Sequence, residues 1–142
     1  VDADSFSSRA AWIWHGVEPE DGKIGTSGLG GGAAGQEIDR YDTRLGSPEH
    51  AVVLASATQF GPDMVRTKEE FEGSVDVTLP DPYVRGDVIF YETPGGGAVF
   101  SASSISWFGA LARNGYDNDI AQMTTNVVRR FADPAPFEPP AT

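Results

Sequence analysis

The sequence predicts a three-layer α/β domain, built on a modest mixed sheet with at least two helices over it. Three observations lead to this fold class. A continuous β-branched apolar run covers residues 50–57, a strand–turn–strand pattern covers residues 87–101, and two segments with helical apolar spacing follow. Short β-branched runs favour strands and a 3.6-residue apolar period favours amphipathic helices, so the chain supplies both kinds of element.

The strands are predicted in chain order. The length and β-branching of the run 50–57 favour a buried strand. A short helix is expected to start at Thr67, where a T-x-x-E capping box begins. Residues 87–92 and 98–101 form two further strands, and the glycine-rich turn 93–97 between them indicates an antiparallel hairpin.

Two helices are predicted after the hairpin. The first begins near Ser103 or Ser104, since either hydroxyl could cap it, and ends at the Asn-Gly pair 114–115. The second begins near Asp117 with an acidic first turn and ends before Pro134. The residues expected in the core are Val52, Val53, Leu54, Val88, Ile89, Phe90, Val99, Phe100, Ile105, Phe108, Leu111, Ile120, Met123, Val127 and Phe131.

Composition excludes several classes of function. The chain has 142 residues and is 39% hydrophobic, which suits one folded domain and is too apolar for disorder. Its net charge of −11 should repel phosphate backbones, so we expect no nucleic-acid partner. The absence of cysteine excludes disulfides, thiolate metal sites and a cysteine nucleophile. No apolar run is long enough for a membrane span and the N-terminus does not read as a signal peptide, so we expect no membrane partner and a cytoplasmic location.

We expect three segments along the chain. Residues 1–27 have little periodicity and are expected to continue from an upstream domain, residues 28–133 to form the α/β domain, and residues 134–142 to be an extended proline-rich tail. Because the first residue is Val1 and not Met, and glycine and proline are abundant, we interpret the chain as a piece of a larger protein. A trimmed form of a complete small protein is the alternative.

A glycine-rich run at 28–35 is the first candidate for a functional site. Such a run could cradle a phosphate, but a dinucleotide site needs a strand directly before it, and residues 18–27 are charged and turn-rich. The alternative is a turn that lets the backbone approach a neighbouring element. Within the run, Gly32 and Ala33 are candidates for lining a substrate pocket.

Three carboxylates, Glu37, Asp39 and Asp42, follow the run directly. Neighbouring carboxylates can perform acid–base work or hold a metal, but among glycines they are also typical of solvated loops. Glu37 lies between small residues and a buried strand, so we expect it to be partly buried and able to serve as a base or nucleophile. Asp39 is a further candidate for the substrate pocket.

The remaining polar candidates are weaker. His50 directly precedes a predicted strand, a position common at active-site mouths in α/β folds, although an ordinary half-buried histidine has the same pattern. His15 and His50 have no partner at metal-ligand spacing, so we expect no metal site in this chain. The serines at 101–104 are interpreted as helix caps, because the G-x-S-x-G pattern of a nucleophile elbow is absent.

Four stretches of the chain, taken in order, carry a family resemblance. They read G-G-G-A-A-G-Q-E-I-D-R at 30–40, L-G-S-P-E-H-A-V-V-L-A-S at 45–56, G-G-G-A-V-F-S-A-S-S-I-S-W at 95–107 and N-V-V-R-R-F at 126–131. This series resembles the C-terminal region of the large (beta) subunit of bacterial N,N-dimethylformamidase and its relatives. The similarity covers nearly the whole chain.

The resemblance implies a hydrolase that splits the C–N bond of a small N-substituted formamide. It implies a class I glutamine-amidotransferase-like (flavodoxin-like) domain, here without the nucleophilic cysteine of true amidotransferases. It also implies a mononuclear iron in the full-length enzyme, held by two tyrosines and a glutamate upstream, so no cofactor is expected in this chain. The family's motif glutamate maps onto Glu37, which would face substrate or water and not metal.

Two hypotheses about function follow. In the first, the chain completes an amidohydrolase site with Glu37, and its partners are a small amide substrate and either the upstream part of its subunit or other subunits of an oligomer. In the second, the chain is a non-catalytic scaffold with a degenerate amidotransferase-like fold. Exposed aromatic residues such as Trp12, Trp14 and Trp107 would then bind neighbouring chains.

Overall fold

The computed structural model describes residues 1–28, 30–67 and 80–140. Within these ranges the chain forms three strands and two α-helices, which are β1 (Val52–Ala57), β2 (Gly86–Glu92), β3 (Ala98–Ser101), α1 (Ser106–Leu111) and α2 (Asp119–Ala132). Single turns of 3-10 helix lie at Ala3–Ser7, Ala11–Trp14, Thr43–Leu45 and Arg113–Tyr116. The short helix expected from Thr67 falls on residues 68–79, outside the described residues.

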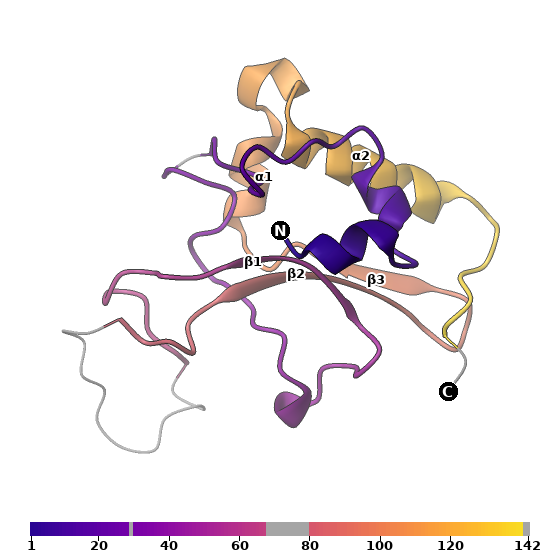
Figure 1. Ribbon diagram of the computed structural model, residues 1–142, viewed down its shortest axis with the longest axis horizontal. Coiled ribbons are helices and arrows are strands. Elements are labelled where there is room, and N and C mark those ends of the chain that lie inside the picture. Colours follow the sequence, from indigo (N-terminus) through magenta and orange to yellow (C-terminus); the bar gives the residue numbers. More distant parts are fainter. Residues whose placement is uncertain (29, 68–79, 141–142) are drawn as a thin grey trace.

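The three strands form one antiparallel sheet in the order β1-β2-β3, which confirms the predicted strands (Figure 1). β2 is central and pairs with β1 over residues 86–90 and with β3 over residues 89–92, and its side chains are the best buried of the three strands. The predicted hairpin between β2 and β3 is also confirmed. Its turn is closed by the Thr93 amide, which donates to the Gly97 carbonyl at 2.8 Å, and by Gly96 at a φ of +81°.

The helices cover one face of this sheet. Figure 1 shows α1, α2 and the N-terminal 3-10 helices on the same side of the strands, with the segment that carries Thr43–Leu45 on the other side. All strand pairs in the described residues are antiparallel. The mixed sheet, the third layer and the amidotransferase-like fold therefore stay predictions, which these three strands do not test.

Helix α2 follows its sequence signals closely. Asn118 caps it, because its Oδ1 accepts the Ala121 amide at 2.9 Å, so the helix begins two residues after the predicted start at Asp117. The preceding Asn114 and Gly115 have φ values of +51° and +64° within the 3-10 helix Arg113–Tyr116, and α1 ends at Leu111, three residues before the predicted Asn-Gly end. No helix in residues 1–28, 30–67 and 80–140 has the length and apolarity needed to cross a membrane.

The predicted apolar face of α1 is wrong. Ile105 is 54% exposed and Phe108 is 82% exposed, whereas Trp107 and Ala110 are buried. The indole of Trp107 packs on the ring of Phe100, with ring centroids 5.9 Å apart, and its Nε1–H donates to a hydroxyl of α2 at 3.0 Å. Because Trp107 buries a large apolar ring and its Nε1–H is hydrogen-bonded, the face of α1 with Trp107 packs on the sheet and the face with Phe108 stays exposed.

The other predicted core residues divide into two groups. Six are buried, namely Leu54, Val88, Phe90, Ile120, Met123 and Val127. Six are half-buried, namely Val52, Val53, Ile89, Val99, Phe100 and Leu111. Phe131 is 42% exposed and does not belong to the buried core, because the apolar stripe of α2 turns toward solvent in its last turn.

Residues 1–27 pack into the same core as the sheet. Ala10, Ile13, Trp14 and Val17 are all buried, and Trp14 Nε1–H donates to a buried serine hydroxyl at 3.0 Å. The proline-rich tail packs as well, since Phe137 contacts aromatic rings of the core. The scaffold hypothesis expected three exposed tryptophans. This is wrong, because Trp14 and Trp107 are buried and Trp12 is half-buried against Phe90.

Candidate functional site

Several glycines in and beside the glycine-rich run pack closely, whereas Gly30 and Gly31 have open space around an added Cβ and positive φ values of +81° and +101°. A Cβ added at Gly28 would lie 2.3 Å from the Gly32 carbonyl oxygen, and one added at Gly25 would lie 2.5 Å from the Ala33 Cβ. The Ala33 amide also donates to the Gly25 carbonyl at 2.8 Å. Residues 1–28 contain no strand that could precede a dinucleotide-binding turn. The geometry therefore favours the interpretation that these glycines allow close backbone approach.

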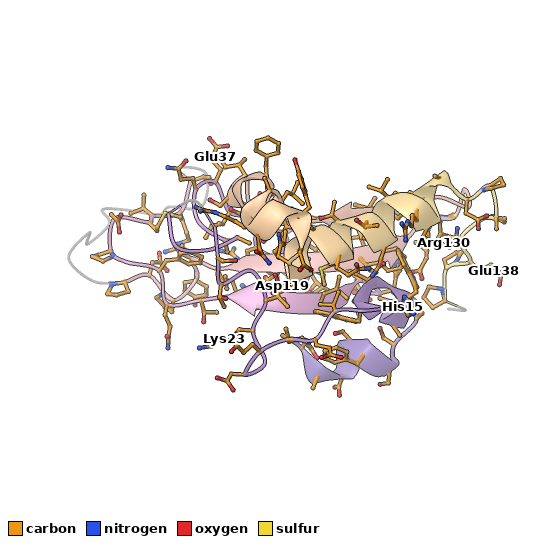
Figure 2. The ribbon with its side chains drawn as sticks, turned by 90° about the horizontal axis from the view of Figure 1, so that it is seen from above. His15, Lys23, Glu37, Asp119, Arg130 and Glu138 are labelled. Atoms are coloured by element: carbon orange, nitrogen blue, oxygen red, sulfur yellow. The ribbon has the colours of Figure 1, made fainter. Side chains whose placement is uncertain are left out.

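Glu37 lies in a turn between this run and the sheet. It has a φ of +47°, which is uncommon for a residue other than glycine. Its side chain is exposed, so the expected partial burial is wrong. Figure 2 shows Glu37 at the margin of the molecule, far from Glu138. The backbone on either side is held to the protein, and the turn leaves the carboxylate facing outward.

The backbone of the Glu37 turn is bonded to the segment that leads into α1. The Gly35 amide donates to Ser104 Oγ at 3.1 Å, and the Gln36 amide donates to Ser106 Oγ at 3.2 Å. After the turn, the Asp39 amide donates to the Ser103 carbonyl at 2.7 Å. The sequence suggested only helix caps for the serines, because their partners lie about seventy positions away.

A surface cavity of about 580 Å³ lies beside this turn. Its lining residues are Gly30, Ala34, Gly35, Gln36, Phe60, Gly61, Asp63, Met64, Ile105, Ser106, Phe108 and Gly109. Gln36 directly precedes Glu37, so the turn adjoins a concave and largely apolar surface, although Glu37 itself does not line it. Such a surface is suited to a small molecule or to apolar side chains of another chain segment.

The other predicted pocket residues do not gather around Glu37. Ala33 is buried and lines a smaller cavity of about 110 Å³ between sheet and helices. The carbonyl group of Gly32 lies close against Gly28. The Asp39 side chain is exposed, while its carbonyl accepts the amide of Asp87 at the start of β2.

His50 lies at the opposite end of β2 from Glu37. Its Nε2 is 2.9 Å from the carbonyl oxygen of Glu92, the last residue of the strand, and its ring meets Tyr91 edge-on. The turn at Glu37, in contrast, joins β2 at its first residues through Asp39. Seven extended residues separate the two ends by about 20 Å. The histidine is exposed, and its contacts are those of a strand-end residue.

Asp42 has a structural role. It caps the 3-10 helix Thr43–Leu45, and Arg44 binds it through Nε at 3.0 Å and through Nη2 at 2.7 Å. The side-chain hydrogen bonds from Arg44 hold the pKa of Asp42 well below its ordinary range. This carboxylate therefore stays ionised and paired, which suits a cap and not a proton carrier.

Two buried carboxylates on β2 were not singled out by the sequence. Asp87 is 3% exposed and accepts the Ser56 hydroxyl at 2.6 Å and the Arg85 guanidinium at 2.8 Å. Glu92 is 4% exposed and accepts Arg9 Nε at 2.7 Å. The sequence feature that could have identified these two carboxylates is an acidic residue near each end of an otherwise apolar strand. Both carboxylates are fully paired, so they fix the ends of the strand.

The described ranges contain no group of three or more histidine, cysteine, aspartate or glutamate side chains placed to hold a metal ion. The residues seen here therefore supply no such ligand set for the iron that the resemblance implies.

Comparison with known proteins decides the family. Residues 2–118 match the family model described as N,N-dimethylformamidase beta subunit-like, C-terminal. The chain belongs to this family. It is 42% identical over 139 residues to the N,N-dimethylformamidase beta subunit of Paracoccus aminophilus, and 41% identical over 138 residues to that of an Alcaligenes species. The predicted resemblance to the C-terminal region of the N,N-dimethylformamidase beta subunit is thus confirmed.

The alignment with these relatives covers 94% of this chain and 18% of each relative. The chain therefore spans about a fifth of the length of the N,N-dimethylformamidase beta subunits that it matches.

Proposed function

We propose that this chain is part of an amidohydrolase that cleaves the C–N bond of a small N-substituted amide such as N,N-dimethylformamide. The observation that carries the proposal is the 42% identity, over nearly the whole chain, to a subunit of that name. Other subunits of the same enzyme, or further parts of the same subunit, are the partners that this proposal requires.

Within this function, Glu37 supplies a carboxylate to the reacting centre. In hydrolysis the water oxygen bonds to the carbonyl carbon, the C–N bond breaks, and a proton passes to the departing amine nitrogen. An exposed carboxylate on a fixed turn can accept a proton from water and return it to the amine. The cavity beside the turn offers an apolar surface for the alkyl groups of such an amide.

The iron of the enzyme, in this proposal, is held by residues outside this chain. Glu37 then contacts substrate or water. The amidotransferase-like fold likewise belongs to the proposal, with further strands completing the sheet.

The test is replacement of Glu37 with glutamine in the complete subunit, assembled with its partners. Release of dimethylamine from N,N-dimethylformamide should slow by about 100-fold or more in kcat, the scale of a lost acid–base group. Glu138→Gln is the matched control, since Glu138 is an exposed glutamate far from Glu37 (Figure 2). A Glu37→Gln enzyme with near wild-type kcat would remove Glu37 from the mechanism.

An assembly role is the second candidate function, and the exposed face of α1 favours it. Phe108 is 82% exposed and Ile105 is 54% exposed, and both line the 580 Å³ cavity. Large apolar side chains gathered on a concave surface are typical of a protein interface. Phe108→Ser should then weaken assembly in size-exclusion chromatography with light scattering, while Glu37→Gln leaves assembly intact. An assembled but fully active Glu37→Gln enzyme would favour the scaffold hypothesis.

A further inference from the structure

The turn at Glu37 owes its shape to side chains that are distant in sequence. Two serine hydroxyls and one serine carbonyl bind its backbone on both sides. Ile38 also forms an isolated antiparallel bridge with Ser104. A glutamate at positive φ persists only where its surroundings fix the backbone, and these bonds provide that fixation.

Ser104 is the central residue of this arrangement. A serine hydroxyl can donate one hydrogen bond and accept two. Ser104 Oγ accepts the Gly35 amide at 3.1 Å and the Ser106 amide at 3.1 Å, and it donates to the Gln36 carbonyl at 3.0 Å. All of its hydrogen-bonding capacity is therefore used, and two of its three bonds go to the residues that precede Glu37.

Ser106 makes the second contact, and a glycine makes it possible. Ser106 Oγ accepts the Gln36 amide at 3.2 Å, one residue before Glu37. A Cβ added at Gly35 would lie 2.6 Å from this oxygen, so any larger residue at position 35 would displace it. The glycine run thus lets the start of α1 approach the turn closely enough for both serines to bind it.

We propose that Ser104 and Ser106 are positioning residues, which hold the Glu37 carboxylate in its reactive direction. The inference rests on the proposed role of Glu37. Ser106 and Gln36 both line the 580 Å³ cavity, so the same contacts also fix Glu37 relative to that surface. A shift of about 1 Å in a catalytic group can cost about 100-fold in rate, so a hydroxyl that prevents such a shift has a measurable effect.

The experiment measures kcat and KM of the complete assembled enzyme carrying Ser104→Ala, Ser106→Ala or both. Ser104→Ala should lower kcat by about 10-fold to 100-fold with KM changed less than threefold, because substrate binding does not require the carboxylate direction. Ser104→Thr, which keeps the hydroxyl, should recover most of the lost rate. Ser101→Ala is the control, since Ser101 lies nearby on β3 and its hydroxyl accepts the amide of Ser103 at 3.4 Å instead of bonding to residues 35–37.

A combined variant separates this proposal from the role of Glu37 itself. If the serines act through Glu37, adding Ser104→Ala to Glu37→Gln should produce no further fall in kcat. An inactive Glu37→Gln enzyme together with a fully active Ser104→Ala/Ser106→Ala enzyme would overturn the positioning role alone. A fully active Glu37→Gln enzyme would instead overturn the proposed catalytic role of Glu37, and the positioning role with it.

A structural readout accompanies the kinetics. Amide hydrogen exchange of the segment 35–39, followed by mass spectrometry on the intact enzyme, should speed up by at least 10-fold in Ser104→Ala and stay unchanged in Ser101→Ala. Unchanged exchange in Ser104→Ala would show that the hydroxyl does not hold the turn and would overturn the inference.

Discussion

Replacing Gly25 with alanine would place a methyl group where the fold has no room for it. Gly25 is buried and has a φ of +64°, and an added Cβ would lie 2.5 Å from the Ala33 Cβ and 2.9 Å from Ile120 Cδ1. Both neighbours belong to the core, so neither can move away cheaply. The substitution therefore tests directly whether close packing explains the glycine at position 25, which faces Ala33 of the glycine-rich run.

The expected loss of stability has two parts. Alanine in the left-handed region costs about 1 kcal/mol relative to glycine. Forcing an extra methyl group into a packed core costs a further 1–3 kcal/mol or so, roughly the range seen for overpacked sites. Gly25→Ala should therefore lower the free energy of unfolding by about 2–4 kcal/mol.

Gly22 provides a matched control for the first part. It has nearly the same backbone angle, with φ +69°, and no heavy atom lies within 4 Å of an added Cβ. Gly22→Ala should cost only about 1 kcal/mol. Equilibrium urea unfolding, followed by circular dichroism, measures both variants under the same conditions.

A second substitution locates the collision. Ile120→Val removes the Cδ1 atom that meets the added methyl group, at a cost of about 1 kcal/mol by itself. In the Gly25→Ala background it should cost less than that or restore stability. Equal losses for Gly25→Ala and Gly22→Ala, with additive effects of Ile120→Val, would refute the packing argument.

Three other predictions concern stability. Hydrogen bonds from Arg44 lower the pKa of Asp42 in the folded chain, so this residue adds stability above about pH 4 that is lost as the pH falls further. The free energy of urea unfolding should therefore fall more between about pH 5 and about pH 3 for wild type than for Asp42→Asn. Equal falls in the two proteins would contradict this. Arg9→Met should lower the free energy of unfolding by about 2–3 kcal/mol, because it leaves the buried Glu92 carboxylate unpaired. This loss is smaller than that for a fully buried ion pair, since a third of the Arg9 side chain is exposed. Glu92→Gln should cost only about 1 kcal/mol, and the reverse order in urea unfolding would be inconsistent with this account. Phe90→Ala should cost about 3–5 kcal/mol, whereas Phe108→Ala should change stability by less than about 0.5 kcal/mol, as thermal unfolding of the two variants would show.

Local patterns in the sequence determined the regular elements. The β-branched runs predicted β1, β2 and β3. The glycine turn predicted the hairpin of β2 and β3, because the pairing of two strands joined by a short turn depends on residues that are close in sequence. The course of α2 was also predicted, since caps act within one turn of the helix, whereas α1 is shorter at both ends than predicted. The family resemblance rested on the same kind of ordered motif.

Tertiary structure alone decided which side of α1 faces the core and where Glu37 lies. Helix α1 is one and a half turns long, so its sequence allows two apolar faces, and only competition for the sheet selects Trp107 over Phe108. The backbone of the Glu37 turn is held by hydrogen bonds with Ser104 and Ser106, which lie 68–70 positions from their partners in the turn. Such long-range bonds leave no periodic signal in the sequence, because they depend on how separate segments meet in the folded chain.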